Sequence, residues 1–310
     1  MSSAPAAGRY GNSNHFSASE PAVTTTISTH TLDAPGATLT YDVRGSLGTA
    51  TPLLIIGSPM GAEGFATLAG HFPDRPVVTY DPRGTGRSPR SGDYGALTPE
   101  DHAADLQRIV DAIGGGPVDV FATSGGAVNA LAWVARHGDS VRTLVAHEPP
   151  LPLLLPDHEA LAAAIHDLGQ TYQREGMGPA MAKFILIAGH DGELPEGWQC
   201  PPVDPAQFGL PTKDDGRRDD ALLAQNLYGC TGYRPEAEAL RGASTRIVLA
   251  RGEASGQTMP ARGADAVARL IGAELVTFPG NHGGFLGGEY GQHGEPDAFA
   301  SRLREVLPDA

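Results

Sequence analysis

Short apolar segments alternate along this chain with segments of helical periodicity, and this alternation constrains the fold more than any other feature. Segment 52–56 is apolar throughout, as expected of a strand that is covered on both faces, and 76–81 is rich in β-forming residues. Segment 98–113 has a strong helical pattern, with Thr98 as N-cap and Pro99 at the first helical position. Strands that alternate with helices predict an α/β fold with a doubly wound, mostly parallel sheet.

The same alternation continues in the second half of the chain. Strands are expected at 118–121, 141–148, 246–252 and 273–280, and helices at 125–137, 260–271 and 296–307. Parallel strands joined by helices bring the carboxyl ends of the strands to one edge of the sheet, where open α/β sheets bind their ligands.

One long interruption divides this pattern. Residues 151–243 contain several helical patterns and a Pro/Gly-rich stretch in place of a strand. We therefore expect a catalytic core formed by residues 25–150 and 244–310, with 151–243 inserted as a helical cap over the carboxyl ends of the strands. Residues 1–24 are rich in Ser, Ala, Gly and Thr without periodicity and are expected to be a flexible leader.

Charge and hydropathy exclude several classes of partner. The chain of 310 residues has 22 Lys and Arg against 36 Asp and Glu, a net charge of −14, so a nucleic acid is not an expected partner. No apolar stretch reaches the length of about 20 residues that a membrane helix needs. The sequence therefore predicts a cytoplasmic protein that binds a small molecule and no membrane, and it leaves a homodimer open.

A serine stands at the corner between the strand at 118–121 and the following helix. Such a corner imposes a strained backbone on Ser124, which requires small residues two positions away on each side, here Ala122 and Gly126. The strain directs the hydroxyl out of the turn, and the N–H of Gly125 points from the helix N-terminus toward an oxyanion formed beside it. Ser124 is therefore the candidate nucleophile and Gly125 the first oxyanion donor.

A serine nucleophile needs a base, which should follow the last strand of such a sheet. His282 has this position, in the glycine-rich run Phe278-Pro-Gly-Asn-His-Gly-Gly. Histidines within the predicted helices, among them His102, are expected to be solvated. The second oxyanion donor should come from the loop after 52–56, where Pro59 has no N–H and the amide of Ser58 is the natural candidate.

Taken together, the order of these motifs resembles the α/β-hydrolase superfamily over about residues 30–307, and more narrowly a group of bacterial esterase-like serine hydrolases with a helical cap. The resemblance rests on Gly57-Ser-Pro-Met-Gly, on Tyr80-Asp-Pro-Arg-Gly-Thr-Gly-Arg-Ser, on Ala122-Thr-Ser-Gly-Gly and on Gly280-Asn-His-Gly. It implies a Ser-His-acid triad and no cofactor. The chain departs from the family at Ile56, where most relatives have a histidine before the oxyanion-loop glycine.

A second departure concerns the triad acid. In most family members the acid is the third residue after a glycine that follows the strand at 246–250, and here that residue is Ser255. A carboxylate is still needed to orient His282 and stabilise its cation. Glu148, at the end of the preceding strand, is our candidate, since some haloalkane dehalogenases of the family take a glutamate from that position. Glu253 is the alternative, and Asp265 comes third.

The residues that line a substrate pocket are harder to identify from sequence. Apolar side chains of the oxyanion loop and the cap are candidates because a substrate held under a cap needs apolar contacts, although helical spacing in the cap is equally consistent with packing of the cap on the core. The candidates are Met60, Met177, Met181, Phe184 and Tyr228. No cluster of residues has metal-ligand spacing, so neither a metal nor another cofactor is expected.

These observations predict a serine hydrolase that cleaves an ester, lactone or activated acyl bond of a moderately apolar small molecule. Two alternatives remain open. A cofactor-independent dioxygenase of this fold would use His282 as base on the substrate, with Ser124 secondary. A ligand-binding protein that has lost its reaction is the second alternative, because the usual acid position is empty.

Overall fold

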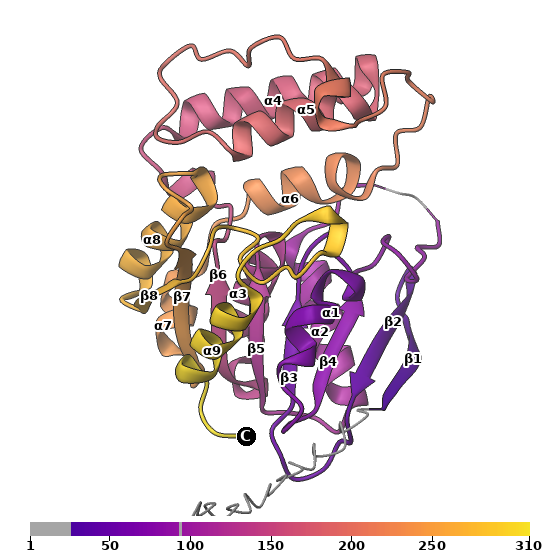
Figure 1. The fold of residues 1–310 in the computed structure, drawn as a ribbon, viewed down its shortest axis with the longest axis vertical. Helices are drawn as coiled ribbons and strands as arrows, with labels where there is room; N and C mark the ends of the chain where they lie inside the picture. The colour runs from indigo at the N-terminus through magenta and orange to yellow at the C-terminus, as the bar shows by residue number, and fades with distance from the viewer. Residues whose placement is uncertain (1–25, 93–94) are drawn as a thin grey trace, which may run out of the picture.

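An eight-stranded sheet organises the protein (Figure 1). The computed structural model describes residues 26–92 and 95–310, so the leader expected at 1–24 lies outside the described residues. The strands are β1 (Ile27–Ala34), β2 (Ala37–Arg44), β3 (Leu53–Ile56), β4 (Val77–Asp81), β5 (Val118–Thr123), β6 (Val141–His147), β7 (Arg246–Gly252) and β8 (Glu274–Phe278).

The strands are arranged in the order β1-β2-β4-β3-β5-β6-β7-β8. β2 pairs antiparallel with β1 and with β4, and the other pairs are parallel, so the expectation of a mostly parallel sheet is confirmed. β1 was not predicted. Its residues are mostly exposed and polar, so the strand has little of the apolar patterning on which the prediction relied.

Helices cover both faces of the sheet. The α-helices that flank the sheet are α1 (Ala66–Gly70), α2 (Pro99–Ala112), α3 (Gly125–His137), α7 (Ala237–Gly242), α8 (Met259–Ile271) and α9 (Pro296–Val306). One hydrophobic cluster joins the sheet to α2, α3, α7 and α8, and a second joins it to α1 and α9. The protein is therefore a three-layer sandwich with the sheet in the middle.

The continuous apolar character of β3 follows from this layering. Leu54 and Ile56 point into the cluster with α2 and α3, whereas Leu53 and Ile55 point into the cluster with α1 and α9. Both faces of the strand are buried, which is why the segment lacks the polar alternation of a one-sided strand.

A long segment between β6 and β7, residues 151–243, has helices of its own, and we refer to it as the insertion. It contains α4 (His158–Glu175), α5 (Met177–Ala188), the π-helix η5 (Ala221–Asn226) and α6 (Leu227–Thr231), and it ends with α7. α4 and α5 pack against each other in a separate hydrophobic cluster and lie at the top of Figure 1, beyond one end of the sheet.

Short helical turns connect the larger elements. They are the 3₁₀ helices η1 (Ala62–Phe65), η2 (Gly138–Ser140), η3 (Pro152–Leu154), η4 (Pro205–Phe208) and η6 (Glu289–Gly291). Among the helices of the described residues, none combines the length and the hydropathy required to cross a bilayer.

Candidate active site

Ser124 lies at a sharp turn between β5 and α3. Its backbone has φ 55° and ψ −129°, a conformation that a residue with a side chain rarely adopts. Its N–H donates to the carbonyl of His147 at 3.0 Å, which ties the turn to β6. A Cβ at Gly126 would lie 2.7 Å from Cα of Gly57, so this position has no room for a side chain. The sharp turn expected from the sequence is therefore present, and Ser124 has the strained backbone that was expected there.

The loop after β3 approaches the start of α3 closely. A Cβ at Gly125 would lie 2.6 Å from the carbonyl oxygen of Ser58, so the two backbones can meet only because residue 125 is glycine. Within the described part of the chain, the N–H groups of Ser58 and Gly125 donate to no other backbone carbonyl. Both residues line the same cavity as Ser124. Two free donors thus lie beside the serine.

His282 lies in the loop that follows β8. The N–H of Ala254 donates to the carbonyl of Gly280 at 2.9 Å, which joins this loop to the loop after β7. Gly280 has φ 76°, a conformation that favours glycine and turns the chain back toward the sheet. The imidazole of His282 is half exposed and lines the cavity that contains Ser124.

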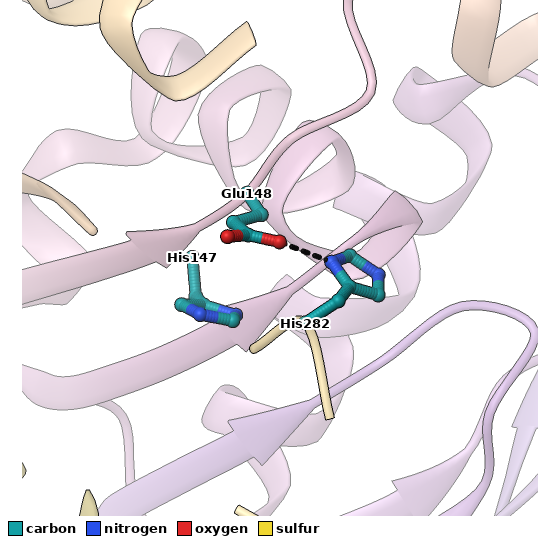
Figure 2. A group of neighbouring side chains, drawn as sticks. All are labelled: His147, Glu148 and His282. Atoms are coloured by element: carbon teal, nitrogen blue, oxygen red, sulfur yellow. Dashed lines mark hydrogen bonds and ion pairs between the residues drawn. The ribbon is translucent and has the colours of Figure 1, made fainter. Parts of the chain in front are cut away.

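Glu148 follows directly after β6, and its carboxylate contacts His282 (Figure 2). The imidazole Nδ1 of His282 lies 2.6 Å from Oε2 of Glu148, and the N–H of Gly252 donates to Oε1 at 2.8 Å. The Glu148 side chain is fully buried and its backbone has φ 48°. Both carboxylate oxygens are therefore hydrogen-bonded, one of them to the histidine, and the Nε2 atom of His282 remains available on the cavity side.

The surroundings of Glu148 keep it ionised. Burial alone raises the pKa of this carboxyl, but the hydrogen bond with His282 and the charges that His147 and His282 can carry outweigh burial and lower the pKa to about 2. The Ser255 hydroxyl adds to the lowering by proximity, although it makes no hydrogen bond of good geometry with a described residue. A carboxylate in this state stabilises a protonated imidazole.

The sequence analysis did not single out His147, the residue before Glu148. Its ring is fully buried, lies 6.0 Å from the ring of His282 and is hydrogen-bonded through Nδ1 to the Thr123 hydroxyl at 3.0 Å. Burial lowers its pKa to about 4, with Glu148 opposing and His282 adding to the shift. His147 therefore stays neutral near pH 7 and places no positive charge beside His282. In the sequence, the only indication of a role for His147 was that it stands beside Glu148 at the end of a predicted strand.

The other carboxylates that were considered lie elsewhere. Glu253 is exposed and has no hydrogen bond with His282. Asp265 accepts from the guanidinium of Arg251 at 2.7 Å. Of the three candidates, the structure brings only Glu148 to the histidine.

A cavity of about 700 Å³ lies between the core and the insertion, over Ser124 and His282. Of the predicted pocket residues, Met60 and Phe184 line it. Met177, Met181 and Tyr228 do not belong to its described lining. Met177 and Met181 pack against the hydrophobic cluster of the insertion, and the ring of Tyr228 lies against Gly169 of α4. The helical spacing of Met177 and Met181 therefore reflects packing within the insertion.

A second cavity, of about 480 Å³, lies on the other side of the loop after β3. It is lined by charged residues such as Asp81 and Arg87, which are paired with each other, and it contains neither Ser124 nor His282. The larger cavity is therefore the one that holds the candidate catalytic groups.

The group His147, Glu148 and His282 brings ligand atoms within 4.8 Å of one another, close enough for a cation to bind in principle. Glu148 already accepts from His282 and Gly252, and His147 is bonded to Thr123 through Nδ1, whereas its buried Nε2 has no hydrogen-bond partner among the described residues. A cation would have to displace these hydrogen bonds in a buried environment. The donor set fits an acid–base pair better than a metal centre.

A further pair of residues was missed because of a wrong expectation. His102 on α2 was expected to be solvated, but it is buried, and its Nε2 lies 2.7 Å from Oδ1 of Asn226 at the end of η5. The Ser58 hydroxyl approaches the same oxygen at 3.5 Å. The insertion thus contacts Ser58 in the loop after β3, which carries one of the two free N–H donors. This loop follows Ile56, the position at which the family resemblance led us to expect a histidine.

Comparisons with known proteins give consistent results. A family model of the alpha/beta hydrolase fold matches residues 53–174. A Bacillus subtilis (strain 168) protein named uncharacterized hydrolase YraK is 31% identical over 289 residues, which cover 91% of this chain and 97% of that protein.

Similar solved structures include a thermophilic esterase from Thermogutta terrifontis, with a TM-score of 0.62, 20% identity and coverage of 91% of this chain and 98% of that one. The enol-lactonase from Burkholderia xenovorans LB400 has a TM-score of 0.62, 17% identity and coverage of 90% and 99%. At these identities the structural likeness concerns the fold.

Proposed function

The chain belongs to the α/β-hydrolase superfamily, and from this premise we propose that it is a serine hydrolase that cleaves an ester, lactone or activated acyl bond of a small, moderately apolar molecule. The contact of 2.6 Å between Glu148 and His282, which lines the same cavity as the strained Ser124, is the observation that carries this proposal. An esterase and an enol-lactonase among the structurally similar proteins support an acyl bond as the target.

The first half of the reaction forms an acyl-enzyme. Ser124 Oγ attacks the carbonyl carbon while its proton passes to Nε2 of His282, and Glu148 stabilises the imidazolium that results. The carbonyl oxygen becomes an oxyanion and accepts hydrogen bonds from the N–H groups of Ser58 and Gly125, each worth about 3 kcal/mol in the transition state. The intermediate then collapses, and the leaving alcohol takes the proton from Nε2.

The second half releases the acid. A water molecule gives a proton to Nε2 of His282 and attacks the acyl carbon, and the same two N–H groups hold the second oxyanion. Collapse returns the proton to Ser124 Oγ and frees the carboxylic acid. In the described structure the Ser124 hydroxyl makes no hydrogen bond with His282, and such contacts commonly tighten when substrate binds.

Labelling and turnover test this assignment together. Wild type, Ser124→Ala, His282→Ala and Glu148→Gln are compared in labelling by a fluorophosphonate and in hydrolysis of p-nitrophenyl esters. We expect Ser124→Ala to lose labelling and Glu148→Gln to reduce kcat by about 10³- to 10⁴-fold, because a neutral amide no longer stabilises the imidazolium. Ser255→Ala, a second serine of the same cavity, is the matched control and should still be labelled.

Other outcomes point to other functions. Undiminished labelling of Ser124→Ala would reject the serine mechanism. Oxygen consumption that partly survives this substitution would favour the cofactor-independent dioxygenase, and stoichiometric binding of ligand without turnover would favour a binding protein. A loss of activity in Glu253→Gln with none in Glu148→Gln would move the acid to the loop after β7.

A further inference from the structure

The described lining of the cavity above Ser124 lacks the four residue types that are ordinarily charged at neutral pH. Its lining, as far as the chain is described, includes no Asp, Glu, Lys or Arg. These four residue types make up 19% of the chain, so their absence from this surface is selective. A substrate that enters the cavity therefore meets no carboxylate, ammonium or guanidinium side chain in this lining.

Besides His282, a thiol and a phenol reach the cavity, and both stay neutral at physiological pH. Burial raises the pKa of the Cys230 thiol to about 12, and burial together with Glu63 raises that of Tyr290 to about 12. Glu148 is ionised, but it lies behind His282, is fully buried and does not belong to the lining. Its charge is therefore committed to the imidazole.

Two kinds of surface make up the cavity. The insertion contributes an apolar wall that includes Leu168, Phe184 and Leu222. Neutral hydroxyl and amide side chains, such as those of Thr258, Asn281 and Gln292, supply the polar part. Such groups satisfy the oxygens of an ester or lactone, and they pair poorly with a full charge because they cannot neutralise it.

Charge in the substrate is therefore costly. A carboxylate or ammonium that is buried here loses its hydration without gaining an ion pair. Building on the function proposed above, we propose that this site selects substrates that are electrically neutral on both sides of the scissile bond, a largely apolar acyl group joined to an uncharged leaving group. The volume of about 700 Å³ suits a small molecule.

A matched series of esters tests this selectivity. p-Nitrophenyl hexanoate, the p-nitrophenyl monoester of adipate and p-nitrophenyl 6-aminohexanoate share a leaving group and a six-carbon acyl chain, which ends in a methyl, a carboxylate or an ammonium and is too long for that end to attack the ester rapidly. After correction for their rates of alkaline hydrolysis, we expect kcat/KM for the neutral ester to exceed both others by at least about 100-fold. Equal corrected values would overturn the inference while leaving the serine mechanism intact.

A binding measurement separates this inference from the mechanism. In Ser124→Ala, a neutral environment-sensitive dye is displaced from the cavity by 2-heptanone or by 6-oxoheptanoate, which differ only in a terminal methyl or carboxylate. We expect the ketone to bind at least about 10-fold more tightly. If no ester is cleaved and the ketone is still preferred, the proposed function fails and the neutrality of the site stands. Equal binding of the ketone and the carboxylate would contradict the proposed selection for neutral substrates.

A substitution at the rim provides the converse test. Ile185 on α5 lines the cavity and is 36% exposed, so a longer polar side chain can be accommodated there. Ile185→Arg should raise the ratio of adipate-monoester to hexanoate hydrolysis by about 10-fold, because it supplies the missing cation. Ile185→Gln, polar but uncharged, is the control. The same ratio in both variants would mean that charge is not what excludes the anionic ester.

Discussion

The backbone of Ser124 has a conformation that glycine adopts with far less strain than serine. Ser124 is held there by its hydrogen bond to β6 and by the close packing of Gly126 on Gly57. Such a residue costs the folded state about 1–3 kcal/mol, which the surrounding structure offsets. The same strain directs the hydroxyl toward the cavity, so stability and the proposed activity are opposed at this one residue.

This opposition predicts the effect of two substitutions on stability. Ser124→Gly should raise the free energy of unfolding by about 1 kcal/mol relative to Ser124→Ala, because glycine relieves the backbone strain and alanine keeps it, while both variants are inactive. The lower conformational entropy of unfolded alanine reduces the difference without removing it. Urea unfolding of both variants measures the difference, and equal midpoints would show that position 124 is unstrained in solution.

Much of the candidate site could be predicted from the sequence. The placement of Ser124 and His282 could be predicted because a strand–turn–helix corner and a strand end position their backbones, and Glu148 could be proposed with the help of the family resemblance. His147 and Asn226 could not, since their contacts depend on burial and on how the insertion packs on the core. The expectation for His102 was wrong because its helix packs that face against the insertion instead of exposing it.

At the scale of elements, β6 ends in two ionisable residues that its neighbours bury. His147 faces Thr123 at the end of β5, and Glu148 faces Gly252 at the end of β7. The pKa of His147 is lowered to about 4 and that of Glu148 to about 2, from ordinary values of 6.5 and 4.5. In both cases the unfolded chain binds the proton at higher pH, so stability falls as the pH falls.

The two shifts act in successive pH windows. His147 withdraws about 3 kcal/mol of stability as the pH falls from 6.5 to about 4, and Glu148 acts below 4.5. His147→Gln should therefore flatten the dependence of the urea midpoint on pH between 6.5 and 4. His137→Gln, at an exposed histidine of α3, is the control and should leave this dependence unchanged. An unaltered slope in His147→Gln would mean that the ring is already protonated when folded.

Elements with strong patterning were the ones predicted well. The helix at 98–113 corresponds to α2, whose start carries the capping box of Thr98 and Asp101, and the core strands match to within a few residues. β1 was missed, because it is stabilised by pairing with β2 and not by burial. One of the helical patterns of the insertion lies near 218–228, where the structure has the π-helix η5 followed by α6, and such a pattern does not distinguish a π-helix from an α-helix.

At the scale of the whole molecule, the insertion is held to the core by a buried ion pair. Arg262 on α8 binds Asp157, which precedes α4, through two hydrogen bonds of 2.7 and 2.9 Å. The same carboxylate accepts from the N–H of Leu194 at 2.8 Å. Asp157 thus joins the start of α4 to α8 and to the segment around Leu194. The cavity lies beneath these segments.

Removing this ion pair should loosen the roof of the cavity. Arg262→Ala leaves Asp157 buried and unpaired, so we expect a loss of about 3 kcal/mol in stability, faster proteolysis within residues 189–220 and a higher KM for neutral esters. Arg269→Ala, at an exposed position of the same helix, is the control. A KM equal to that of wild type together with unchanged proteolysis would indicate that other contacts hold the insertion.

The origin of the proposed triad acid in β6 has a consequence for engineering. Residues 253–258, which follow β7 and border the cavity, need to supply no proton-relay group, and the site requires only the preceding Gly252 amide from this strand end. Combinatorial libraries can therefore be confined to this short stretch, where the varied side chains reach bound substrate while the proposed proton transfer between Ser124 and His282, supported by Glu148, is left unchanged.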